Sequence, residues 1–259
     1  MLVIADNLNI RNAAYTDALK KRDKNIIGAM AKDMAKKGAD MIMVQCSLDG
    51  SGDQELLPLA VEAAQRAGLP LCLDSRDEKA LAKAAQLCKE PPLVNYLSAD
   101  EKNVDAILAF VRDTKSSLVL RALKGTVPMT LEAKLMILEE LIEKANEADI
   151  PNERLFADPS VVHIGRAMGQ EHLMNAHECI IALNEMVDPP INTVIWLSNV
   201  TTGLSKKLRS RVASAYLCYL AGAGLNAAFI DVTDDEVMKA VYLIRSFRDA
   251  VIFSPADIS

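Results

Sequence analysis

The chain has 259 residues, a formal net charge of −6, 51% hydrophobic residues and only 4% aromatic residues. The length and apolar content suit one large α/β domain over residues 1–259, while the acidic balance and the scarcity of aromatic rings argue against a nucleic-acid surface. No apolar run reaches the roughly 20 residues that a membrane-spanning helix needs, so we expect no membrane association.

Eight short apolar runs alternate with longer stretches of helical periodicity along the chain. Near-continuous apolar runs are typical of parallel strands that are buried on both faces. The predicted strands span residues 2–6, 41–46, 71–74, 93–95, 118–123, 155–158, 193–199 and 227–231. Because βα units of about 30 residues follow one another without a linker, the pattern favours a closed (β/α)₈ TIM barrel over an open doubly wound sheet.

Capping residues indicate where several helices begin and end. Ser98 with Glu101, and Thr233 with Glu236, have the spacing of a capping box, in which each side chain bonds the other residue's backbone N–H. Thr130 is predicted to cap a long helix that follows it. Glycines that closely precede a strand are predicted to end helices in the left-handed conformation: Gly38, Gly68 and Gly224.

Five cysteines are scattered along the chain, and none of them forms a Cys-x-x-Cys pair. An odd, scattered set suits reduced thiols, so we expect a cytoplasmic protein. A zinc or iron–sulfur site built by this chain is not expected either. The first residues are predicted to form a strand rather than a signal peptide, since no basic segment precedes them.

Polar residues follow the predicted strands at the edge where a barrel of this kind holds its working groups. They are Asp6, Asn7, Asn9, Gln45, Asp74, Asn95, Lys124, Asp158, Asn199 and Asp231. Carboxylates and carboxamides dominate this set, and it contains no histidine and no Ser–His pair. A hydrolytic triad or a metal-ligand cluster therefore has little support, and we expect no metal site.

A carboxylate among carboxamides can form hydrogen bonds that match the edge of a pterin ring. The ring presents an N–H beside an exocyclic NH₂, and one carboxylate accepts this donor pair with both oxygens. Asp74, Asn95 and Asp158 are on nearby predicted strands and can supply such a set. The alternative for each Asp is that it caps the helix that follows its strand.

A resemblance to a known family rests on four segments: Leu71-Cys72-Leu73-Asp74-Ser75, Val94-Asn95, Phe156-Ala157-Asp158-Pro159 and Leu197-Ser198-Asn199-Val200. They are similar to the successive motifs of the methyltetrahydrofolate–corrinoid methyltransferases. This family belongs to the pterin-binding barrel superfamily, which includes dihydropteroate synthase and the folate domain of cobalamin-dependent methionine synthase. The resemblance runs from the first predicted strand to the eighth with similar spacing.

The resemblance implies a methyl transfer between N5 of tetrahydrofolate and the cobalt of a corrinoid. It implies that Asp74, Asn95 and Asp158 hydrogen-bond the pterin and that Asn199 reaches N5, so Asn199 and Asp74 are the predicted catalytic residues. The other predicted substrate contacts are Asp6, Gln45, Ser198 and Lys206. Lys206 is expected either to meet the glutamate tail of the folate or to lie on a solvated helix face.

The corrinoid is expected on a separate partner protein, because this chain lacks an Asp-x-His-x-x-Gly cobalamin motif. The resemblance further implies a homodimer. Three departures from the family pattern bear on the shape of the pocket and the direction of transfer: Gln45 ends a strand that commonly ends in Asp-Leu-Asn, Trp196 replaces a small residue, and Tyr96 replaces a Ser. They suggest a member that serves a catabolic demethylation system.

The sequence is also compatible with three other functions. Ser205-Lys206-Lys207 echoes a Ser-Arg-Lys element of dihydropteroate synthase, although the long motif of that enzyme after the first strand is missing. Lys124 could form the Schiff base of an aldolase if burial or a cationic neighbour lowered its pKa. The altered second strand is also compatible with a folate-binding subunit that has lost turnover.

Overall fold

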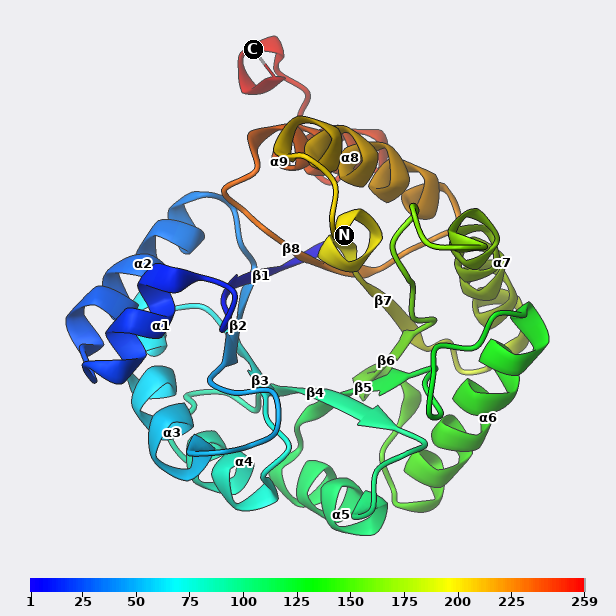
Figure 1. Cartoon of the computed structure of the whole chain (residues 1–259). Helices are drawn as coiled ribbons and strands as arrows, with labels where there is room; N and C mark the ends of the chain where they lie inside the picture. Colours follow the sequence, from blue (N-terminus) through cyan, green and yellow to red (C-terminus); the bar gives the residue numbers. More distant parts are fainter. Residues whose placement is uncertain (259) are drawn as a thin grey trace.

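The computed structural model describes residues 1–258. Eight parallel strands pair in chain order, and β8 pairs with β1 to close a barrel (Figure 1). The strands are β1 (Leu2–Leu8), β2 (Met41–Gln45), β3 (Leu71–Asp74), β4 (Leu93–Ser98), β5 (Ser117–Arg121), β6 (Leu155–Asp158), β7 (Asn192–Trp196) and β8 (Ala227–Ile230). The predicted (β/α)₈ barrel is confirmed, and the open sheet is excluded.

The helices form a ring around the barrel (Figure 1). They are α1 (Ala13–Lys20), α2 (Lys24–Lys36), α3 (Asp53–Ala64), α4 (Glu78–Ala85), α5 (Val104–Thr114), α6 (Leu131–Glu147), α7 (Gly169–Met186), α8 (Lys206–Gly222) and α9 (Asp235–Phe247). Short 3₁₀ turns are η1 (Gln65–Ala67), η2 (Asn152–Arg154), η3 (Leu197–Thr201) and η4 (Pro255–Ile258). Within residues 1–258 no helix is long and apolar enough to cross a bilayer, and all five cysteines are free.

The inside of the barrel holds a small apolar core that is distinct from the larger core between strands and helices. This inner layer consists of Ile4, Met43, Cys72, Leu93, Val119, Val194, Ala227 and Phe229. Side chains alternate along a strand, so the residue two positions further on returns to the inner side. At those positions stand Asp6, Gln45, Asp74, Asn95, Arg121 and Trp196, and Asp158 stands two positions beyond Phe156, which packs against the same core. The apolar floor of the barrel therefore supports a polar layer at the carboxyl ends of its strands.

Four strands end earlier than the sequence predicts: β2 and β8 by one residue, and β5 and β7 by two or three. The strand expected over residues 118–123 ends at Arg121, because the N–H of Leu123 bonds back to the carbonyl of Arg121 and turns the chain out of the sheet. The strand expected over residues 193–199 ends at Trp196, and the following residues form η3. Lys124 therefore lies beyond the end of its strand, and Asn199 lies on a turn above the barrel edge.

The two helices predicted to begin at capping boxes begin at other residues. Ser98 is the last residue of β4, where it pairs with Arg121, and α5 begins only at Val104. The last helix is capped by Asp234, whose carboxylate accepts from the N–H of Val237 at 3.3 Å. In both cases an additional turn separates the strand from its helix.

The predicted cap of α6 and the predicted helix ends are confirmed. Thr130 accepts a hydrogen bond from the N–H of Ala133 at 3.2 Å. Gly224 has a φ of +98°, and a Cβ there would lie 2.5 Å from the side-chain nitrogen of Asn184. The positive φ favours glycine there, and a Cβ would also require the Asn184 side chain to shift. Gly38 and Gly68 also have positive φ angles.

Candidate functional site

A cavity of about 170 Å³ opens at the carboxyl ends of the strands. This end of a barrel is where enzymes of this architecture carry out catalysis. The cavity is lined by Asn9, Arg11, Gln45, Leu48, Asp74, Arg76, Tyr96, Arg121, Trp196 and Asn199. It thus contains the two predicted catalytic residues, Asp74 and Asn199, together with Gln45.

The carboxylate of Asp74 is held by two carboxamides. Gln45, Asp74 and Asn95 are register partners on β2, β3 and β4. Gln45 Nε2 donates to Asp74 Oδ2 at 2.8 Å, and Asn95 Nδ2 donates to the same oxygen at 3.1 Å. Within residues 1–258, Asp74 Oδ1 has no protein partner. All three side chains are buried, so one oriented carboxylate oxygen is left for a ligand with N–H donors.

Neither Asp74 nor Asp158 caps a helix, so the alternative predicted for these residues is wrong. The N-cap of α4 is Asp77, whose carboxylate accepts from the N–H groups of Lys79 and Ala80. Asp158 accepts from the N–H of Ser160 at 2.8 Å, in a loop well before the start of α7. Both Asp side chains belong to the polar layer of the barrel, where Asp74 lines the cavity and Asp158 is buried behind it.

Burial raises the pKa of three carboxyl groups in this layer. It raises the pKa of Asp74 to about 6, although the hydrogen bonds from Asn95 and Gln45 oppose the shift. It also raises the pKa of Asp6 to about 6 against a hydrogen bond from Trp196. The pKa of Asp158 rises for the same reason, opposed by the charge of Arg121. Clustered carboxyl groups with raised pKa values are a mark of functional sites.

Arg121 is a site residue that the sequence reasoning missed. Its Nε lies 3.6 Å from Asp158 Oδ2 and donates to Ser160 Oγ at 3.1 Å. Its guanidinium lies 4.6 Å from the ring centre of Tyr96, and the guanidinium of Arg76 lies 4.0 Å from the same ring centre. Alternation from Val119 predicts an inward side chain at position 121, but a strand extended to residue 123 hides that signal.

Trp196 connects Asp6 to the cavity. Its indole N–H donates to Asp6 Oδ2 at 3.0 Å, and its ring stacks on Phe229 with ring centres 5.0 Å apart. Asp6 itself is buried and does not line the cavity. The bulky residue at position 196 therefore covers Asp6 and supplies an apolar wall of the cavity.

Asn199 lies on η3, which follows β7 at the mouth of the cavity. Its carboxamide has no hydrogen-bond partner in the part of the chain that the structure describes. The N–H of Ile164 bonds to the carbonyl of Val200 at 2.9 Å, which ties η3 to the loop after β6. The neighbouring Ser198 hydroxyl is buried beside Asp6 and does not line the cavity. The turn thus presents the uncommitted carboxamide of Asn199 to the cavity.

Several predicted residues lie outside this arrangement. Lys206 is exposed in the first turn of α8 and does not line the cavity, so it can reach only a part of a ligand that extends beyond the mouth. Lys124 is exposed on a turn with Thr126, which removes the buried lysine that an aldolase needs. Asp231 is exposed and bonds Thr233. Residues 1–258 contain no group of three His, Cys, Asp or Glu side chains placed to hold a metal ion.

Solved structures share this barrel. Dihydropteroate synthase from Thermus thermophilus superposes with a TM-score of 0.65 at 18% identity, covering 96% of this chain and 94% of that one. The DHPS of Yersinia pestis, solved with a pterine-sulfa conjugate, gives a TM-score of 0.68 at 17% identity over 96% of this chain and 94% of its own. At these identities the similarity shows the fold.

Sequence comparisons define the family. A methylcorrinoid:tetrahydrofolate methyltransferase from Eubacterium limosum is 26% identical over 247 residues, which cover 93% of this chain and 89% of that protein. An uncharacterised protein from Methanocaldococcus jannaschii is 29% identical over 138 residues, or 51% of this chain and 25% of that protein. The profile of the pterin binding enzymes matches residues 6–231, from the end of β1 to the end of β8. The chain therefore belongs to the pterin-binding enzyme family.

Proposed function

We propose that this chain is a methyltransferase that moves a methyl group between N5 of tetrahydrofolate and the cobalt of a corrinoid held by a separate protein. The observation that carries the proposal is the buried Asp74 carboxylate, which Gln45 and Asn95 hold through one oxygen while the other remains free beside the cavity. The E. limosum relative, similar along most of its length, bears the name of this reaction.

The polar layer of the barrel supports pterin binding. The ring N–H and the exocyclic NH₂ of a pterin are donors, and the carboxyl oxygens of Asp74 and Asp158 can accept from them. Asn95 and Gln45 orient Asp74, and Asn95 also offers its carbonyl oxygen to the ring. Asp6 contributes through the indole of Trp196, whose ring gives an apolar surface for the heterocycle.

Methyl transfer from N5 is limited by the poor leaving ability of tetrahydrofolate. A hydrogen bond to N5 stabilises the negative charge that develops there as the bond to the methyl carbon breaks. The carboxamide of Asn199 lines the cavity without a protein partner within residues 1–258, so its NH₂ is available for this role. In the opposite direction the same contact orients the lone pair of N5 for attack.

The proton that N5 finally holds cannot come from a carboxamide. We propose that water in the cavity delivers it and that Asp74 relays it, since burial raises the pKa of this carboxyl group to about 6. Gln45, whose Nε2 donates to the same carboxylate, holds Asp74 in place for this step.

The cobalt is delivered from outside this chain in our proposal. A partner protein presents its corrinoid at the open end of the barrel, over Trp196 and Asn199, through a contact of modest area that can form and dissociate in each cycle. The resemblance to the family also leads us to propose a homodimer, which light scattering of the purified protein tests.

The direct test uses purified protein, methylcob(III)alamin and tetrahydrofolate. Cobalt dealkylation is followed by absorbance, and 5-methyltetrahydrofolate is measured as the product. We expect Asn199→Ala to lose turnover and to keep its tetrahydrofolate affinity. The matched control is Asn175→Ala, since Asn175 lies on α7 and bonds the carbonyl of Met129 away from the cavity. If Asn199→Ala turned over at the wild-type rate, the role assigned to Asn199 would be contradicted.

Two other outcomes would redirect the assignment. Binding of a pterin diphosphate by the wild-type protein would favour an enzyme of the dihydropteroate synthase type. Tetrahydrofolate binding without turnover, even with a protein-bound corrinoid, would indicate a folate-binding subunit. Absence of any tetrahydrofolate binding would overturn the proposal as a whole.

A further inference from the structure

Lys134 lies near the start of α6 and is completely buried. Its Nζ donates to the carbonyl oxygens of Pro159 and Ser160, each at 2.7 Å. These two residues directly follow Asp158, whose side chain belongs to the polar layer of the barrel. A buried ammonium group on an outer helix is therefore tied to the loop that carries a site carboxylate.

The position of Lys134 departs from two general rules of protein electrostatics. Buried cations normally have a carboxylate partner, yet within residues 1–258 no carboxylate forms an ion pair with this Nζ. A cation near the start of a helix also faces the positive end of the helix dipole. Burial lowers the pKa of Lys134 to about 8, opposed by Cys179 and Asp158. Such departures from local rules concentrate at functional sites.

On the cavity side, the same loop is fixed by a second set of contacts. Ser160 has a φ of +54°, a left-handed conformation that residues with side chains rarely adopt. Its N–H donates to Asp158 Oδ1 at 2.8 Å, and its hydroxyl accepts from Arg121 Nε at 3.1 Å. The carbonyls of this turn point away from the cavity, where Lys134 is their hydrogen-bond donor. The orientation of Asp158 thus depends on a turn that is held from both sides.

We propose that Lys134 is a positioning residue of the pterin site and acts through Pro159 and Ser160 on the carboxylate of Asp158. This inference rests on the proposed function. Lys134 contacts neither the cavity nor the substrate. Without its Nζ, the two buried carbonyls lose their donor, the turn relaxes, and the Ser160 N–H no longer holds Asp158 Oδ1. The carboxylate then loses the orientation in which it meets the pterin edge.

The test measures tetrahydrofolate affinity through the fluorescence of Trp196, which lines the cavity and is the only tryptophan of the chain. We expect Lys134→Met to raise the dissociation constant about tenfold, as for the loss of one hydrogen bond to a charged group. The rate of methyl transfer at saturating folate should stay within about twofold of the wild type, because Asn199 is untouched.

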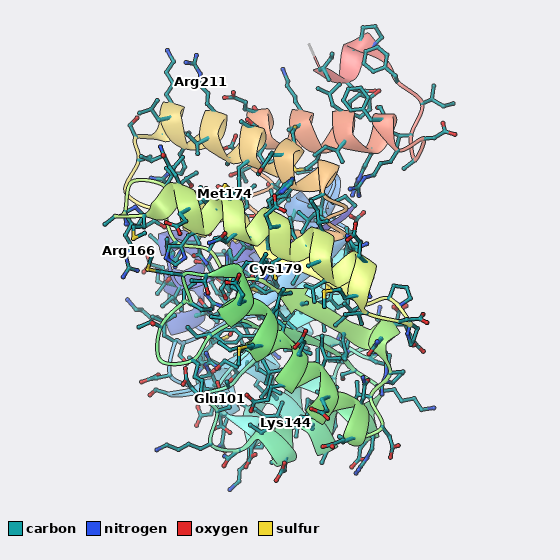
Figure 2. All side chains as sticks on the ribbon, turned by 90° about the vertical axis from the view of Figure 1, so that its right-hand side faces the viewer. Glu101, Lys144, Arg166, Met174, Cys179 and Arg211 are labelled. Atoms are coloured by element: carbon teal, nitrogen blue, oxygen red, sulfur yellow. The ribbon has the colours of Figure 1, made fainter. Side chains whose placement is uncertain are left out.

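The matched control is Lys144→Met on the same helix. Lys144 is half-exposed and pairs with Glu140 one turn away, and Figure 2 shows it on the outer surface of the molecule. This variant removes the same charge from α6 without touching the loop after β6. Its tetrahydrofolate affinity should equal that of the wild type.

A double-mutant cycle separates positioning from a general loss of stability. If Lys134 acts through Asp158, the double variant Lys134→Met/Asp158→Asn should bind tetrahydrofolate no more weakly than Asp158→Asn alone. In the Asp74→Asn background, by contrast, Lys134→Met should weaken binding as much as it does in the wild type. If Lys134→Met fails to fold, Lys134→Gln keeps a donor for one carbonyl, and we expect it to show a smaller loss with the same dependence on Asp158.

If both Lys134 variants bound tetrahydrofolate as tightly as the wild type, the inference would be overturned. It would also be overturned if Lys134→Met weakened the affinity equally when added to Asp158→Asn and to Asp74→Asn. A wild-type protein that does not bind tetrahydrofolate would instead overturn the proposed function itself and, with it, the inference. The two failures are distinguishable because the first requires a wild type that binds.

Discussion

Gln45 Nε2 lies 2.8 Å from Asp74 Oδ2, between two residues that are register partners on β2 and β3. Gln45 stands where the family commonly ends its second strand in Asp-Leu-Asn, so a carboxamide is retained at this strand end although the residue differs. Its NH₂ engages one oxygen of the carboxylate and leaves the other beside the cavity. The departure from the family pattern therefore preserves an oriented acceptor.

Asp74→Asn should stabilise the protein at alkaline pH and weaken folate binding. The pKa of Asp74 is about 6 in the fold and about 4 in an unfolded chain, so its stability contribution is complete below about pH 4 and is lost as the pH rises through 6. The neutral amide avoids this loss, because its oxygen still accepts from Gln45 and Asn95. We expect a gain of about 2 kcal/mol at pH 8 from urea unfolding, a smaller gain at pH 5, and a roughly 100-fold weaker affinity for tetrahydrofolate.

The control for this prediction is Asp77→Asn, which changes a half-buried helix cap instead of a fully buried carboxylate. It should not be more stable than the wild type at pH 8. Equal unfolding free energies for wild type and Asp74→Asn at both pH values would show that the buried charge carries no penalty.

Arg121→Met should destabilise the protein more than Arg76→Met, although both guanidinium groups lie over the ring of Tyr96. The Arg121 and Asp158 side chains are 15% and 7% exposed, whereas Arg76 and its partner Glu101 are 29% and 22% exposed. Removing Arg121 leaves a buried carboxylate without its cation, at a cost of about 2 kcal/mol. The more solvated pair contributes about 1 kcal/mol or less. Urea unfolding of the two variants at pH 7.5 gives the comparison, and equal losses would contradict it.

Lys206→Ala should affect only folates that extend beyond the cavity. Lys206 is exposed on α8, outside the residues that line the site, so its predicted contact with the substrate is limited to the glutamate tail. We expect a tailless tetrahydropterin to bind wild type and variant equally. A tetrahydrofolate with several glutamates should bind the variant about threefold more weakly, an effect that high salt removes. Weaker binding of the tailless pterin would place Lys206 nearer the ring than the structure does.

The local sequence was sufficient for the barrel and for most of its polar layer. Continuous apolar runs that end in Gln45, Asp74 or Asp158 mark buried parallel strands and their carboxyl ends, because alternation and burial act within a few residues. The cap at Thr130 is equally local, since it involves one hydroxyl and an N–H three residues later. The family motifs then indicated which strand ends matter.

The tertiary structure decided which of these groups meet. Trp196 donates to Asp6 across 190 residues of sequence, and Gln45 and Asn95 converge on one oxygen of Asp74 only because the register of β2, β3 and β4 aligns them. Where β5 stops also depends on a turn that bonds back to Arg121, and this places Arg121 rather than Lys124 in the site. Strand register, strand ends and barrel closure are set by packing between distant segments, and no short window of sequence contains that information.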